Sequence, residues 1–371
     1  MQNMTLNHDP LISLNINGSA DDYDDYESIY NVEIGSVPVW YHIMATATLT
    51  ALCINGVLFN GLVLRHFWIR RNKLNQYSIV LINLAVVELI QATVGISFDV
   101  ASLLQHGWKF GMPVCTASGL LVSTAGYVSI FTLCLLSFMG YGSVLRFHKN
   151  STQDPSMHTI YKLLFITWLY AFCLSLPPLF GWGRYAPELS GVGCAPDWHS
   201  KARNESYIVW ILIFGFIIPT TTIIISSVLT YCESHKTNNP RVDRKSRQRL
   251  FFKSRKINIQ LIIAMNIAYL ICWSPYATVA VIHCFITRNI IGPTISLIPT
   301  IAVKISVCAN PLLYIAYNPN LDKTFDKTDS LEELEDEEAE NYSSPSLKIL
   351  LQEVKEDPDQ ENKTSKSTIS G

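Results

Sequence analysis

The chain has 371 residues, of which 49% are hydrophobic and only 16% are charged. Its apolar residues are gathered into long runs, which excludes an ordinary soluble domain. The formal net charge of -2 says little by itself, and nothing in it suggests a nucleic-acid partner.

Runs of about 20 apolar residues each predict seven membrane spans. Because lipid offers the backbone no hydrogen-bond partners, only helices and closed barrels cross it, and barrel strands would be shorter and alternating. We therefore expect an all-α membrane protein, a bundle of seven transmembrane helices. In chain order the spans cover roughly 40–65, 77–102, 112–145, 161–181, 206–233, 256–286 and 290–316.

Charge predicts the orientation of the bundle. The segments 65–73 and 234–256 are dense in Lys and Arg, whereas the loops on the other side carry few. By the positive-inside rule the first set is cytoplasmic, so the N-terminus lies outside and the C-terminus inside. The protein is expected to be a multi-pass protein of the plasma membrane.

Both tails differ in composition from the spans. Residues 1–36 are polar and acidic with no signal-peptide pattern, and sequons begin at Asn3, Asn17 and, in a later outer loop, Asn204. We expect 1–36 to be a glycosylated extracellular tail and 37–325 to be the membrane domain, which ends in a short amphipathic helix. Residues 326–371 are acidic and contain Ser and Thr, which predicts a disordered cytoplasmic tail that a receptor kinase and arrestin could bind.

Two of the nine cysteines are predicted to face outside, Cys115 at the start of the third span and Cys194 in the loop after the fourth. In an oxidising compartment these two form the expected disulfide, which would pin the 182–205 loop over the bundle.

Lys304 is the most informative residue because it lies near the middle of the seventh span. No other Lys or Arg occurs between Arg288 and Lys323. An ammonium at that depth costs about 2.5–3.5 kcal/mol on insertion scales, so it usually marks a functional site with a partner. A lysine that faces a water-filled interior is the plainer alternative.

Several motifs resemble those of the rhodopsin-like G-protein-coupled receptors. They are Asn310-Pro311-Leu-Leu-Tyr314 in the last span, Cys272-Trp273-Ser-Pro275-Tyr276 in the sixth, Asn83-Leu-Ala-Val-Val-Glu88 in the second, Asn60 and Pro219. Within that family Lys304, six residues before Asn310, narrows the resemblance to opsins. The resemblance implies retinal, 11-cis or all-trans, bound to Lys304 as a protonated Schiff base. It implies a light-sensing receptor rather than an enzyme, with no metal site.

A buried cation needs a carboxylate partner, and two candidates stay open. Many vertebrate visual pigments carry a Glu at the position of Ser118, which cannot serve here. Glu188 matches the loop glutamate of many invertebrate and bistable opsins, and it is the favoured counterion. Asp99, in the outer half of the second span, is the alternative. The resemblance also implies a pocket formed by Trp273, Tyr276, Gly119, Ser123, Gly126 and Phe216, in which Tyr276 could orient Glu188.

The output side departs from the family pattern. Where the third span should end in Glu/Asp-Arg-Tyr, the chain reads Met139-Gly140-Tyr141, and Ser227 replaces the usual Tyr of the fifth span. Tyr141, Asn310, Pro311 and Tyr314 remain as expected activation-switch residues. A light-sensing receptor that signals to a heterotrimeric G protein is the main hypothesis.

A retinal photoisomerase with little or no G-protein coupling is the alternative that suits the missing pair at residues 139–140. A receptor in which Lys304 pairs with a diffusible ligand is a further alternative.

Overall fold

The computed structural model describes residues 38–148, 154–188, 190, 192–197, 205–237, 246–285 and 293–318. The sequons at Asn3, Asn17 and Asn204, the predicted amphipathic helix and the acidic tail lie outside these ranges.

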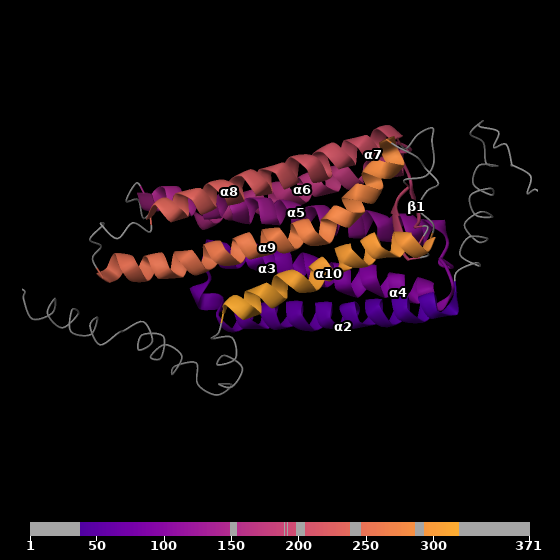
Figure 1. Cartoon of the computed structure of the whole chain (residues 1–371), viewed down its shortest axis with the longest axis horizontal. Helices are drawn as coiled ribbons and strands as arrows, with labels where there is room; N and C mark the ends of the chain where they lie inside the picture. Colours follow the sequence, from indigo (N-terminus) through magenta and orange to yellow (C-terminus); the bar gives the residue numbers. More distant parts are fainter. Residues whose placement is uncertain are drawn as a thin grey trace, which may run out of the picture.

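Helices dominate the described part of the chain and run along one another in an elongated bundle (Figure 1). Seven of the helical stretches in this part are long and apolar enough to cross a membrane, which confirms the predicted fold class. The helices are α2 (Val39–Ile69), α3 (Gln76–Ile90), η2 (Gln91–Ile96), α4 (Ser97–Leu104), α5 (Met112–His148), α6 (Met157–Ser175), α7 (Glu205–Ile211), η4 (Leu212–Ile217), α8 (Ile218–Thr237), α9 (Ser246–Phe285) and α10 (Pro293–Tyr317), with short 3-10 turns η1 (Arg71–Lys73) and η3 (Pro177–Phe180).

The second and fifth spans each contain a π-helical turn, η2 and η4. The second span is therefore α3, η2 and α4 in one piece, and the fifth is α7, η4 and α8. A π turn holds more residues than an α turn, so it rotates every side chain that follows it around the helix axis. η2 thus helps to set the direction in which Asp99 points.

Apolar side chains fill the bundle interior and also cover much of its outside. The inner cluster includes Leu84, Leu133, Leu136 and Met265, all buried. Ile43, Phe165 and Ile225 are by contrast more than half exposed, on three different helices. Large apolar side chains on the outer face fit a protein whose surroundings are lipid tails.

At two of the prolines inside helices, Pro275 and Pro311, a polar side chain donates to the backbone carbonyl that the proline leaves without a partner. Pro275 in α9 has no N–H for the Ile271 carbonyl, and the Ser274 hydroxyl donates to that oxygen at 3.3 Å. Pro311 in α10 leaves the Val307 carbonyl, and the Asn60 amide of α2 donates to it at 3.0 Å. Both helices therefore continue through a point where the backbone alone would lose a bond.

A two-stranded hairpin lies across one end of the bundle (Figure 1). Its antiparallel strands are β1 (Tyr185–Pro187) and β2 (Cys194–Pro196), with Pro187 opposite Cys194. The predicted disulfide joins Cys115 of α5 to Cys194. Arg184 pairs with the buried Asp197 at 2.6 Å, which closes the base of the hairpin.

Candidate functional site

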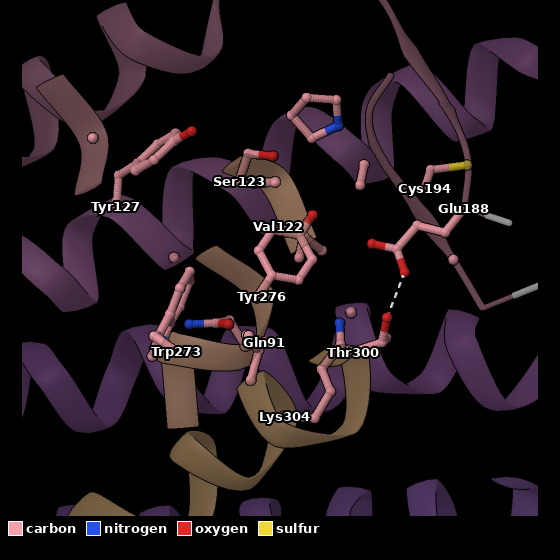
Figure 2. A pocket seen from close by; sticks show the side chains of 18 of the residues that line it. Gln91, Val122, Ser123, Tyr127, Glu188, Cys194, Trp273, Tyr276, Thr300 and Lys304 are labelled. Atoms are coloured by element: carbon pink, nitrogen blue, oxygen red, sulfur yellow. Dashed lines mark hydrogen bonds between the residues drawn. The ribbon is translucent and has the colours of Figure 1, made fainter. Parts of the chain in front are cut away.

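Lys304 opens into a cavity between the helices and beneath the hairpin (Figure 2). The cavity has a volume of about 130 Å³. On the same measure a single water molecule needs about 10–15 Å³. It therefore has room for a ligand of many atoms. Its walls come from the second, third, fifth, sixth and seventh spans and from the hairpin.

Lys304 and Asp99 form an ion pair inside this cavity. Lys304 Nζ lies 2.8 Å from Asp99 Oδ2, and the two side chains are only 13% and 5% exposed. Two buried charges are tolerated when they neutralise each other at hydrogen-bond distance. Asp99 is the third residue of α4, which begins at Ser97.

Glu188 is a second carboxylate at the same cavity, partly buried and directly after strand β1. Its Oε2 accepts a hydrogen bond from the Thr300 hydroxyl at 3.0 Å and one from Ser190 at 3.4 Å (Figure 2 shows the first). Burial raises the pKa of Glu188 to about 7, although the nearby Lys304 ammonium acts in the opposite direction. The site thus joins one ammonium to two carboxylates, and burial favours a proton on Glu188.

Most of the expected pocket residues line the cavity. Trp273 and Tyr276 of α9 project into it (Figure 2), and Ser123 and Gly126 of α5 and Phe216 of η4 also line it. A Cβ on Gly126 would lie 3.6 Å from the Trp273 ring, an ordinary van der Waals distance, so this position faces the indole. The cavity is long, largely apolar and charged at one end.

The structure differs from the prediction at Gly119. That residue does not line the cavity, because the Tyr185 ring of the hairpin fills the space beside it, 2.6 Å from where a Cβ would be. Tyr185 itself is anchored by its hydroxyl, which donates to the Ser175 carbonyl at 2.8 Å. Gly119 therefore makes room for the hairpin rather than for a ligand.

Sequence reasoning missed Thr300 and Gly193. Thr300 lies one helical turn before Lys304, so the i, i+4 spacing on α10 could have suggested that it shares the lysine's face. Gly193 is in a loop whose fold depends on the disulfide, and no local signal marks it.

The expected switch residues of α10 lie further along the bundle. The Asn310 amide donates to the buried carboxyl of Glu88 on α3. The Tyr314 ring packs 5.2 Å from that of Phe67 on α2, centroid to centroid. Pro311 and Asn60 meet through the Val307 carbonyl, as described above.

A neutral hydrogen-bond cluster joins three helices in the half of the bundle that charge predicts to be cytoplasmic. The amide nitrogen of Asn266 on α9 donates to Ser137 of α5 at 2.8 Å and to Ser227 of α8 at 2.9 Å. We call Asn266, Ser137 and Ser227 the inner clamp. Tyr141 is partly buried one turn beyond Ser137, and a Cβ on Gly140 would touch Ile262 of α9 at 3.4 Å.

Comparisons with known proteins agree with this geometry. The family described as 7 transmembrane receptor (rhodopsin family) matches residues 59–314. The chain is 30% identical to a rhodopsin of Sminthopsis crassicaudata over 75% of this chain and 79% of that protein. It is 28% identical to green-sensitive opsin-3 of Psalidodon fasciatus, with 79% and 80% covered.

A third relative and one solved structure are also similar. A GQ-coupled rhodopsin of Mizuhopecten yessoensis is 29% identical, over 81% of this chain and 62% of that protein. The solved structure of squid rhodopsin superposes with a TM-score of 0.69 at 22% identity, covering 79% of this chain and 86% of that one. This last likeness bears on the fold alone.

Proposed function

Because this chain belongs to the opsins, the light-sensing members of the rhodopsin family of seven-transmembrane receptors, we propose that Lys304 carries retinal and that Asp99 balances its charge. The protein is thus a multi-pass receptor of the plasma membrane rather than an enzyme. The ion pair between Lys304 and Asp99 is the observation that carries the proposal.

The residues that line the cavity fit retinal. Bound retinal supplies an aldehyde carbon to the Lys304 amine and, as a protonated Schiff base, absorption of visible light. The apolar cavity beside Trp273 and Tyr276 suits a polyene, and the charged end of the cavity lies at Lys304. Asp99, at 2.8 Å, would hold a proton on the Lys304 nitrogen.

The geometry favours Asp99 over Glu188 as the direct counterion. Resemblance to invertebrate and bistable opsins pointed first to Glu188, but its carboxylate accepts its hydrogen bonds from Thr300 and Ser190. Burial also raises the pKa of Glu188 to about 7, so this group is partly protonated near neutral pH. We assign Glu188 the role of a second, titrating carboxyl that shares the field of Lys304.

The test is the absorption spectrum of purified protein incubated with 11-cis or all-trans retinal, beside Lys304→Ala. A visible band in the native protein that is lost in Lys304→Ala supports the proposal. The isomer that gives the larger band in the dark identifies the resting chromophore. Well-folded protein with no visible band from either isomer rules the proposal out.

We also propose that the light-driven change reaches a heterotrimeric G protein through α9 and α10. Retention of Asn310, Pro311 and Tyr314, and the inner clamp between α5, α8 and α9, support a movable cytoplasmic face. The experiment is light-dependent nucleotide exchange on purified G proteins of several classes. Lys304→Ala, which has no amine to bind retinal, is the control.

A retinal photoisomerase remains the second candidate because Met139 and Gly140 stand where the family carries an acid and an Arg. That function predicts a dark preference for all-trans retinal, release of a different isomer after light, and no nucleotide exchange. Exchange in light with no isomer release eliminates it.

A further inference from the structure

Gly193 lies against the carboxylate of Asp99. It precedes Cys194 in the hairpin, is buried, and has a φ of +69°. A Cβ at this position would lie 2.1 Å from Asp99 Oδ1 and 3.3 Å from its Cγ. A Cβ cannot come so close to an oxygen, so any side chain here requires either the hairpin or the carboxylate to move.

The hairpin has little freedom to retreat. The next residue, Cys194, is bonded to Cys115 of α5, and the backbone N–H of Glu188 donates to the Gly193 carbonyl at 3.1 Å. Ala186 and Tyr185 of the opposite strand are buried. A covalent bond and the strand pairing therefore fix Gly193 in space.

Asp99 is held between two neighbours. Its Oδ1 faces Gly193, and its Oδ2 faces Lys304 Nζ at 2.8 Å. Since the hairpin is anchored, the easier movement for a clashing group is rotation of the Asp99 side chain. That rotation would carry the carboxylate away from the lysine.

We propose that Gly193 is a positioning residue for the Lys304–Asp99 pair. Its lack of a side chain lets the disulfide-anchored hairpin seat the Asp99 carboxylate on Lys304, which leaves Glu188 as the indirect carboxyl. This role of Gly193 rests on the proposed function. The ion pair exists without retinal, so the role of Gly193 and the binding of retinal can be tested separately.

The chain offers a matched control in Gly181. Its φ is +83°, close to that of Gly193, yet nothing lies within 4 Å of a Cβ built there. Alanine at either position suffers the same backbone strain at positive φ. Only at Gly193 does it also meet Asp99, so the difference between the two variants isolates the contact.

The first readout is reductive methylation of retinal-free protein with formaldehyde and cyanoborohydride, followed at Lys304 by mass spectrometry. Only an amine that has lost its proton reacts. A carboxylate partner shifts that equilibrium about tenfold or more, so Gly193→Ala is expected to raise the methylation rate about tenfold, as Asp99→Asn does. Gly181→Ala should stay within about twofold of the native rate, since it leaves the partner in place.

A double variant separates loss of the partner from a wider opening of the cavity. If Gly193 acts through Asp99, adding Gly193→Ala to Asp99→Asn causes no further change. A native-like rate in Gly193→Ala, or an equal rise on the Asp99→Asn background, overturns the proposal. No rise in Asp99→Asn itself also overturns it, because the ion pair would then be absent.

A second variant keeps the proposal testable if Gly193→Ala does not fold. If Gly193→Ala fails to fold, Gly193→Ala combined with Asp99→Ala should fold, since the clashing oxygens are gone. Failure of that pair, when Gly181→Ala and Asp99→Ala each fold, contradicts the steric account. A native protein that forms no visible band with retinal but passes the methylation test would sink the proposed function and leave this inference standing.

Discussion

The two halves of the bundle handle buried polarity in opposite ways. Near the hairpin, Lys304, Asp99 and Glu188 are charged or titratable groups gathered around one cavity. Near the other end, Asn266 joins Ser137 and Ser227 through neutral hydrogen bonds, and Met139 and Gly140 stand where the family carries charges.

The difference has a physical meaning. Removing one partner of a buried charge pair leaves the other charge uncompensated at a large cost, so such a pair suits a site that must hold one ionisation state. A neutral hydrogen bond contributes only about 0.5–1.5 kcal/mol to stability, so such bonds suit helices that must separate and return. The contacts of the outer half suit electrostatic selectivity, and those of the inner half suit movement.

Removing the Asp99 charge should have the largest effect on this contrast. In retinal-loaded Asp99→Asn, the visible band is expected to be lost at a pH about 2 units or more below that of the native protein, since the proton on the Lys304 nitrogen loses its partner. Spectra across a pH series measure the midpoint. Glu188→Gln is the matched control, and a larger shift there than in Asp99→Asn would reverse the counterion assignment.

Glu188 should make the stability of the outer half depend on pH. Its pKa is raised from 4.5 to about 7 in the folded state, so its contribution is fully present below about pH 4.5 and is lost as the pH rises through 7. The loss amounts to at most about 3 kcal/mol. Melting temperatures of retinal-free protein from pH 4 to 8 should fall more steeply for the native chain than for Glu188→Gln, and identical slopes contradict this.

Breaking the inner clamp should have a moderate effect that involves no proton. Asn266→Ala removes two hydrogen bonds and is expected to lower the free energy of unfolding by about 1–3 kcal/mol, equally at pH 5 and pH 8. Thermal unfolding at both values measures it. Asn258→Ala, on the same helix but outside the clamp, should change stability by less than about 0.5 kcal/mol.

The smallest change expected is in Ser274→Ala. It removes the hydroxyl that donates to the Ile271 carbonyl at Pro275, at a cost of about 0.5–1 kcal/mol, the net contribution of one hydrogen bond. Hydrogen exchange of amides near residue 271 should quicken while that of α5 does not. Unchanged exchange would show that the hydroxyl does not support the helix.

The sequence predicts the seven spans well because a lipid environment forces long apolar helices. It predicts Lys304 because a lone cation inside such a span is costly. It leaves two candidates for the lysine's partner, since a π turn such as Gln91–Ile96 rotates Asp99 and has no distinct composition. It misplaces Gly119, because the Tyr185 ring that fills its space arrives from a loop 66 residues later in the chain, folded by the disulfide.

At Pro275, α9 lacks one backbone hydrogen bond, and a long segment of the helix precedes this point. The helix extends from Ser246 to the Ile271 carbonyl without another proline, and Trp273, which lines the cavity, lies within the break. At about 1.5 Å per residue that arm is about 38 Å long, so each 5° of bending at the break moves its far end by about 3 Å. A small bend at Pro275 would thus move the end of α9 that charge predicts to be cytoplasmic by several ångströms.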